Sequence, residues 1–461
     1  MRERWGIRTI IGGLGLLSLL GYAAGVPRVA GAGDRALVAY VGLFLGLFVL
    51  YLLAAWVVLR RASRDRALLG MILGFGLLFR LVVLPSPVLL SSDVYRYLWD
   101  GRVQWAGINP YRYAPAAEEL APLQDPAIYP QINRPTKRTV YPPGAQASFA
   151  LVAGIAPNSI LAWRLFLLGC EVATAVLLLR LLRRMGVPGA AVLLYAWAPL
   201  AVFEGVQAGH VDLAFLPAVL LALSWRQEGR MARAGAALGI AVLMKLYPAV
   251  LLLAWWRRGE WRFPAACAAT VAVGYLPYLA GARAPGQWPG SSVVGFLPEY
   301  FGSAEDFNIG LRFFLTEGIG LGGEVARGTT MLLLFGVLLA VLLWIGRGRA
   351  ENARGVFRAG MAAAAAYLVL VPTAMHAWYA VWILPFLTVQ TSAAWLWFTG
   401  AVALSYLKYA WEPGGFPFWV RAVEFLPLYG LLAWEWRAGR AVPAPPGHRP
   451  GWQPGVAPPA P

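Results

Sequence analysis

Long apolar runs recur along the sequence from the N-terminus to about residue 434. Runs of about 17 to 25 apolar residues are long enough to cross the hydrocarbon core of a bilayer as helices. Several contain Pro, which a membrane bundle tolerates when neighbouring groups bind the freed backbone. The sequence therefore predicts an all-α integral membrane protein, a polytopic bundle of about 12 to 14 transmembrane helices. The runs lie near 8–26, 37–59, 67–90, 160–179, 187–204, 211–225, 232–247, 263–281, 329–345, 357–372, 377–390, 394–410 and 416–434, with 248–256 as a short extra crossing.

The composition argues against a soluble protein of this length. Only 13% of the 461 residues are charged and 59% are hydrophobic, whereas soluble chains are about 25% charged. The net charge of +17 would suggest nucleic-acid binding in a soluble protein. In a membrane protein it has another explanation, because cytoplasmic loops concentrate Lys and Arg.

A simple topology with the N-terminus inside the cell collects this charge on one side. The segments that hold 23 of the 39 Lys and Arg and 6 of the 22 Asp and Glu, and so the whole +17, become cytoplasmic. We therefore expect a multi-pass plasma-membrane protein with both termini cytoplasmic and no nucleic-acid partner. These segments are 1–8, 60–66, 180–184, 226–233, 257–262, 346–358 and the chain from 435 onward.

The same topology places two large segments outside the membrane, 91–158 and 283–307. The first is expected to carry amphipathic helices. Together with the spans they form a single membrane domain over residues 1–440. The tail at 441–461 is rich in Pro, Ala and Gly without apolar periodicity, so we expect it to be disordered.

The first outer segment begins SSDVYRYLWDGRVQWAGINPYRYAP, which predicts an amphipathic helix at the membrane surface. Asp93 falls in the first turn of this helix, after serines that can cap it. It is therefore either a helix-start acid or a catalytic carboxylate. Asp100, beside Arg96 and Arg102, fits either an ion-pair partner or a site residue.

Cations on the outer side need an explanation, because the positive-inside trend does not place them there. Arg134 and Arg138 lie with Lys137 in a Pro-rich stretch, where they either bind an anion or balance nearby acids. Lys245 lies at the outer end of an apolar helix, where it is either functional or extends to the interface. His376, one of three histidines, is either functional or a buried core residue.

No metal or nucleotide motif occurs in the sequence. Glu204, His210 and Asp212 lie near one another, but their spacing matches no metal-ligand pattern. The second outer segment, around Asp306, combines aromatic residues with carboxylates and an amide, a combination common in sugar recognition. We therefore expect no metal site and no nucleotide-activated substrate.

Five strings together resemble a known group of enzymes: DVYRYLWDGRVQWAGINPYRYAP, YPPGAQ, GHVDLAF, KLYPAVLL and HAWYAVWILPF. They are similar to the polyprenyl-phosphate-sugar-dependent glycosyltransferases of the GT-C superfamily, above all the bacterial and archaeal mannosyltransferases of family 87. The resemblance covers about residues 67–390. It implies a large first outer loop with a catalytic acid just beyond a helix end, and Asp93 matches that position. The family often has two adjacent acids, whereas Val94 follows here, so a second carboxylate such as Asp100 or Asp306 could assist.

The resemblance also implies an inverting transfer of a hexose, most of all mannose, from a polyprenyl-phosphate donor to an extracytoplasmic lipid or glycan acceptor. Lys245 and His376 are expected to bind the donor phosphate, with Arg134 and Arg138 as further candidates. No cofactor is implied beyond the lipid-linked sugar, which is a co-substrate. The residues expected to line the substrate are Tyr97, Asp100, His210 and Asp306.

A multi-pass transporter or flippase of a lipid-linked sugar is the alternative from another class. Pro-interrupted helices with polar residues inside the membrane also suit transporters. The absence of visible internal repeats and the gathering of ionisable residues at one face favour the transferase. A protein O-mannosyltransferase would differ only in its acceptor.

Overall fold

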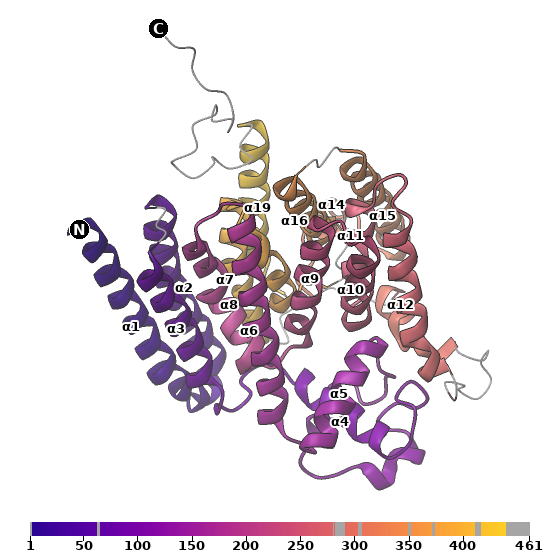
Figure 1. Cartoon of the computed structure of the whole chain (residues 1–461). Helices are drawn as coiled ribbons and strands as arrows, with labels where there is room; N and C mark the ends of the chain where they lie inside the picture. The colour runs from indigo at the N-terminus through magenta and orange to yellow at the C-terminus, as the bar shows by residue number, and fades with distance from the viewer. Residues whose placement is uncertain are drawn as a thin grey trace.

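The computed structural model describes residues 2–61, 65–279, 281, 291–302, 307–348, 352–370, 374–410 and 416–438. This part of the chain is helical and contains no strand. The long helices lie side by side, and a layer with α4 (Asp93–Trp105) and α5 (Pro143–Ile155) covers one end of the bundle (Figure 1). The predicted all-α polytopic membrane fold is confirmed. Asp306, the tail at 441–461 and much of 283–307 lie outside the described residues.

Six of the described helices are long and apolar enough to cross a membrane, and a pair bent by 55° between Gly189–Ala196 and Pro199–Gln207 could form a seventh span. The remaining apolar runs of the sequence are shorter or interrupted helices, which is why the sequence estimate of about 12 to 14 spans is higher. The six long helices are α1 (Arg2–Ala30), α2 (Ala36–Arg60), α3 (Arg66–Val83), α6 (Ile160–Arg184), α15 (Glu324–Arg347) and α16 (Ala353–Leu370).

Proline explains most of the interruptions. Pro199, Pro217, Pro248 and Pro385 each stand within the first two positions of a new helical segment, where the missing N–H costs nothing. Pro277 instead stays inside α12 (Arg262–Leu279). The other helices are α7 (Leu193–Ala196), α8 (Pro199–Ala201), α9 (Leu216–Gln227), α10 (Met231–Met244), α11 (Val250–Trp255), α13 (Leu297–Gly302), α14 (Leu311–Leu315), α17 (Leu384–Leu387), α18 (Ala393–Ala401) and α19 (Phe418–Arg437).

The segments that the charge pattern assigns to one side of the membrane contact one another. Polar contacts join five pairs of these segments or their neighbouring turns at the end of the bundle opposite α4 and α5 (Figure 1). The positive charge is therefore gathered at one end of the fold, as the sequence predicts. The contacts are Arg8–Asp65, Arg184–Glu228, Arg226–Glu260, Gln227 with the carbonyl of Ala353, and Arg354 with the carbonyl of Met185.

A buried ion pair holds α3 and α6 to the bent helix pair. Arg80 Nε lies 2.7 Å from Glu171 Oε2, and both side chains are almost fully buried. Arg80 also donates from Nη1 to the carbonyl of Ala196 at 2.7 Å, at the point where α7 ends. The guanidinium thus neutralises a buried carboxylate and binds a carbonyl at a helix end, where intrahelical partners are missing.

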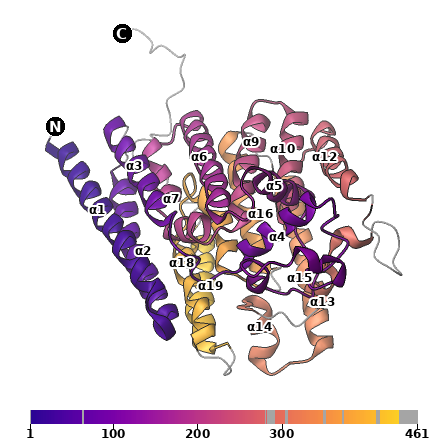
Figure 2. The ribbon, with the colours of Figure 1, turned by 90° about the horizontal axis from the view of Figure 1, so that it is seen from below.

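The layer that carries α4 is fixed by close helix contacts. A Cβ atom on Gly101 would lie only 2.6 Å from the carbonyl oxygen of Phe149 in α5, and one on Gly144 would lie 2.9 Å from the backbone of Leu243 in α10. Only glycine permits backbones to approach this closely. Seen from below, α4 and α5 lie across the end of the bundle, with α1–α3 at one edge (Figure 2). Glycine contacts therefore tie α4 to α5, and α5 to the bundle.

Candidate active site

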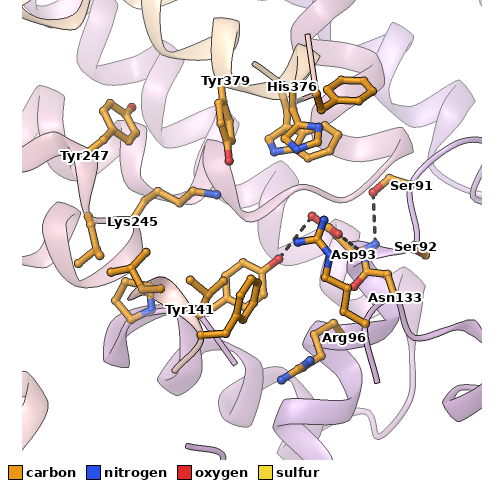
Figure 3. Close-up of a pocket in the computed structure, with 18 of the residues that line it drawn as sticks. Ser91, Ser92, Asp93, Arg96, Asn133, Tyr141, Lys245, Tyr247, His376 and Tyr379 are labelled. Atoms are coloured by element: carbon orange, nitrogen blue, oxygen red, sulfur yellow. Dashed lines mark hydrogen bonds between the residues drawn. The ribbon is translucent and has the colours of Figure 1, made fainter. Parts of the chain in front are cut away.

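A cavity of about 450 Å³ lies between the start of α4 and the ends of several bundle segments. Its wall draws on parts of the chain that are far apart in sequence, including 90–96, 133–142, 245–247 and 376–382. Asp93, Lys245, His376 and Tyr379 all point toward this space (Figure 3). The fold thus brings four of the residues that the sequence singled out into one cavity, namely Asp93, Lys245, His376 and Arg134.

Asp93 is the first residue of α4 and is half-buried in the cavity wall. Asn133 donates from Nδ2 to its Oδ1 at 2.5 Å, and the Tyr141 hydroxyl donates to its Oδ2 at 3.4 Å. Burial raises the pKa of Tyr141 well above its usual value, and the charge of Asp93 acts in the same direction. The phenol therefore remains a donor, and the carboxylate is oriented while still facing the cavity.

A series of buried contacts behind the cavity wall holds the backbone of Asp93. Ser92 stands at the N-cap but makes no side-chain cap bond; instead Ser91 Oγ accepts from the Asp93 backbone N–H at 3.2 Å. Ser91 Oγ lies 2.8 Å from His210 Nε2, and His210 Nδ1 lies 3.0 Å from Glu204 Oε2, off the direction of a straight hydrogen bond. Tyr406 donates to Glu204 at 2.9 Å. This buried series positions the start of α4.

Lys245 follows α10 as its C-cap residue and lines the cavity. Its Nζ lies 3.0 Å from Asp212 Oδ2, and Asp212, which is fully buried, also accepts from Trp382 Nε1 at 3.1 Å. One fifth of the Lys245 side chain remains exposed. Its ammonium therefore faces the cavity, while Asp212 neutralises its charge and fixes its position. The ion pair with Asp212 explains how a lysine can be held at the end of an apolar helix.

His376 lies in a stack of aromatic rings. Its ring centroid is 4.7 Å from that of Phe307 and 4.3 Å from that of Trp378, and Trp378 in turn stacks on His210 at 3.9 Å. Burial lowers the pKa of His376 to about 3, although nearby Asp93 acts in the opposite direction. His376 is therefore neutral at physiological pH and can offer a ligand an N–H group but no positive charge.

Aromatic side chains form most of the remaining wall. Their faces suit the C–H faces of a sugar ring as well as apolar chains, and their hydroxyl and indole groups add polar contacts. The cavity is therefore shaped for a ligand that is partly apolar and partly polar. The rings are Tyr141, Tyr247, Phe296, Phe307, Tyr367, Trp378, Tyr379, Trp382, Tyr406 and Tyr409.

Three of the residues expected to line the substrate lie away from the cavity wall. Asp100 is buried between Arg96 and Gln146, each 2.8 Å from one of its oxygens. Tyr97 is buried under α5, where it stacks on Phe149, and His210 lies behind the wall as described above.

The two basic candidates of the outer segment are separated. Arg138 lines a different, shallower hollow with Lys137 and Glu299, which form an ion pair. Arg134 does line the cavity, with its guanidinium 5.7 Å from the ring centre of Phe296. Arg134 is therefore the basic residue of this stretch that could meet a ligand.

The sequence patterns do not indicate the roles of several residues that line the cavity. Asn133 and Tyr141, which hold Asp93, lie 40 and 48 positions after it, and the sequence pattern marks Ser91 only as a helix cap. Tyr379 shares the cavity with Lys245, whose Nζ is 5.3 Å from its ring centre. Tyr141 begins the YPPGAQ string and Tyr379 lies in HAWYAVWILPF, so the strings marked the region but not the roles.

Glu204, His210 and Asp212 do not point toward one common centre. Asp212 faces Lys245, whereas His210 contacts Glu204. Among the residues that the structure describes, no group of three or more His, Cys, Asp or Glu is placed to hold a metal ion.

The fold and the site define a multi-pass helical membrane protein whose ring-lined cavity holds an oriented carboxylate and a fixed cation at one end of the bundle. The sequence profile of the MptA/B family, described as alpha-(1->6)-mannopyranosyltransferase, N-terminal domain, matches residues 18–257, just over half of the chain. The chain belongs to this family, and the expected GT-C mannosyltransferase is confirmed at that level. No curated protein matches the chain significantly. The matched residues include Asp93, Tyr141 and Lys245, while His376 lies beyond them.

Proposed function

We propose that this mannosyltransferase takes mannose from a polyprenyl-phosphate donor and transfers it, with inversion, to a hydroxyl group of an extracytoplasmic glycan or glycolipid. The observation that carries the proposal is the meeting of Asp93 and Lys245 in one ring-lined cavity. A carboxylate can accept a proton, and an ammonium can balance a departing phosphate. Family membership supports the mannosyl group; the resemblance to family 87 supports the lipid donor.

In this proposal Asp93 is the general base. The acceptor hydroxyl oxygen attacks the anomeric carbon of mannose while its proton passes to the Asp93 carboxylate. The bond between the anomeric carbon and the phosphate oxygen breaks, and its electron pair leaves with the polyprenyl phosphate. Asn133 and Tyr141 already hold the carboxylate, so little reorganisation is needed at the moment of reaction.

Lys245 balances the charge that the phosphate gains as it leaves. Its position at the end of α10 places it in a bundle helix, where a donor anchored in the membrane can reach it. Arg134 stands on the outer-segment side of the cavity and is a second cation for the phosphate or for the acceptor. His376 contributes an N–H group and a stacking face. The reaction as proposed uses no metal ion and no other cofactor.

The charges support a proposed orientation in the membrane. The end of the bundle opposite the cavity holds the basic segments, which favour the cytoplasm. We therefore propose that the protein resides in the plasma membrane with both termini cytoplasmic and the cavity on the outer side, where the lipid-linked donor and the acceptor meet.

The test is a transfer assay with the purified full-length protein in proteoliposomes. Polyprenyl-phosphate mannose and GDP-mannose are offered separately with a short oligomannoside acceptor, and the anomeric configuration of the product is read by NMR. We expect product only from the lipid donor, with inverted configuration, and with unchanged rate in EDTA.

Two results would contradict the proposal. Efficient use of GDP-mannose, or a product of retained configuration, would refute the donor or the mechanism. Movement of the labelled lipid between leaflets without any glycosylated product would instead support the flippase alternative.

A further inference from the structure

A separate hollow, of about 500 Å³, lies at the end of the bundle opposite the active-site cavity. It is formed by the start of α3, the last turns of α6 and the turn that follows α6, and we call it the α3–α6 hollow. Its lining residues are Asp65, Arg66, Leu69, Leu179, Arg183 and 186–190. Both helices are candidate membrane spans, so the hollow lies where a bilayer surface meets the protein.

The charged groups at the hollow leave an excess of positive charge. Arg66 is the first residue of α3, Arg183 lies in the last turn of α6, and both are exposed. Neither guanidinium has a hydrogen-bond or ion-pair partner within the described residues. Two guanidinium groups are thus available to one anionic group in the hollow, and arginine binds phosphate particularly well.

The one carboxylate of the hollow is already engaged. Arg8 binds both oxygens of Asp65, at 2.7 and 2.8 Å, and Asp65 also caps α3 by accepting from the Ala67 N–H at 2.9 Å. The bond from Arg8 is the main reason why the pKa of Asp65 lies below its usual range. Asp65 is therefore neutralised by Arg8 and does not cancel the charge of Arg66 and Arg183.

The inner wall of the hollow is apolar. Leu69 lies one turn inside from Arg66, and Leu179 one turn inside from Arg183. A Cβ atom on Gly189 would lie 3.3 Å from a methyl group of Leu69 and 3.6 Å from one of Leu179, so the glycine keeps this part open. The hollow therefore combines cations at the level of the headgroups with an apolar surface about 5 to 6 Å deeper, at the level of the upper acyl chains.

We propose that the α3–α6 hollow binds an anionic phospholipid, with its phosphate on Arg66 and Arg183 and its upper acyl chain against Leu69 and Leu179. Basic pockets between transmembrane helices commonly hold such headgroups. A soluble anion would use the two arginines but gain nothing from the leucines. This site is independent of the mannosyltransferase cavity and of the donor proposed for it.

The test compares lipids on the purified full-length protein in a neutral detergent. Phosphatidylglycerol, phosphatidylcholine and inorganic phosphate are titrated separately, and binding is followed by native mass spectrometry and by the rise in Tm, since a ligand that binds only the folded state stabilises it. We expect phosphatidylglycerol to bind and to raise Tm, and phosphatidylcholine and phosphate to do so far less.

The variant Arg66→Gln/Arg183→Gln should weaken phosphatidylglycerol binding roughly tenfold or more. The matched control is Arg262→Gln/Arg358→Gln, which removes two exposed cations from segments of the same end but outside the hollow, and it should bind as the wild type does. Gly189→Leu leaves every charge in place and should also weaken binding, because its side chain fills the space beside Leu69 and Leu179.

Three results would overturn the proposal. The first is unchanged lipid binding in Arg66→Gln/Arg183→Gln. The second is an equal loss of binding in the control pair, which would reveal only a general charge effect. The third is a Tm shift by inorganic phosphate equal to that by the lipid. If Gly189→Leu does not fold, the two arginine pairs still decide the question, because all four of their side chains are exposed.

Discussion

Helix α4 carries two aspartates, seven positions apart, in opposite situations. Asp93 faces the cavity and is held by an amide and a phenol. Asp100 is 2% exposed and receives Arg96 on one oxygen and Gln146 on the other. A carboxylate whose lone pairs already serve a guanidinium cannot take a proton from a substrate without breaking that pair. The partners around each residue, and not the residue type, therefore separate the carboxylate that we propose as the base from the structural one.

The strongest test of this contrast is Asp93→Asn. The amide keeps the size of the side chain but cannot accept the proton, so we expect kcat to fall by about 10²- to 10⁴-fold. Tm should stay close to that of the wild type, because Asp93 makes no ion pair with any residue that the structure describes. Single-turnover transfer and a melting curve measure both. Turnover within tenfold of the wild type would remove Asp93 from the role of base.

Asp100→Ala should show the reverse pattern. It removes the only carboxylate bound to the buried Arg96 among the described residues, leaving this guanidinium with the Lys137 carbonyl, and breaking a buried ion pair costs about 3 to 5 kcal/mol. We expect a clear drop in Tm, with kcat per folded molecule close to normal at low temperature. Asp34→Ala, an exposed acid between α1 and α2, is the control and should melt like the wild type. A loss of kcat without a loss of Tm would mean that Asp100 takes part in the chemistry.

Lys245 can likewise be tested for a role in donor binding as against a role in the fold alone. Lys245→Met should weaken donor binding by about 1.5 to 3 kcal/mol, the range for a hydrogen bond to a charged group, seen as a higher KM for the donor. It also leaves Asp212 buried without its cation. In the double variant Asp212→Asn/Lys245→Met that carboxylate is gone, so Tm should recover while KM stays high. Recovery of both would show that Lys245 serves only the fold.

The smallest expected effect concerns pH and His376. Its folded-state pKa of about 3 lies below the ordinary value of 6.5, so between these values the unfolded chain binds a proton that the folded chain does not. Stability from His376 is complete above pH 6.5 and is lost as the pH falls toward 3. We expect the Tm of the wild type to drop more than that of His376→Gln between pH 7 and pH 5. An equal drop would contradict the lowered pKa.

The sequence predicted well those features that depend on one segment at a time. Arg8, Asp65, Arg184 and Glu228 lie at a common end of the fold because positive charge marks one side of a membrane whatever the packing. The start of α4 at Asp93 follows in the same way from the serines before it and the apolar spacing after it.

Pairings between distant segments could not be read from the sequence. The sequence leaves two roles open for each of Asp93 and Asp100. The Arg96–Asp100 pair lies within α4 and is one of these alternatives, whereas Asn133 and Gln146 become partners only through the packing of the chain near residue 133 and of α5. The burial of Asp100 is not predicted either, because a segment that covers a helix leaves no mark in the local sequence. Helix lengths were overestimated because a proline that starts a new helix, such as Pro385, has the same composition around it as one inside a span.

The close contact at Gly101 has an evolutionary consequence. Gly101 lies eight positions after Asp93, and the glycine can meet the Phe149 carbonyl at only one rotation of α4. Deleting or inserting one residue between them would turn Asp93 by about 100° away from the cavity. We therefore expect related chains to exchange side chains freely along this stretch but to keep its length constant, so that the number of residues is inherited more strictly than most of their identities.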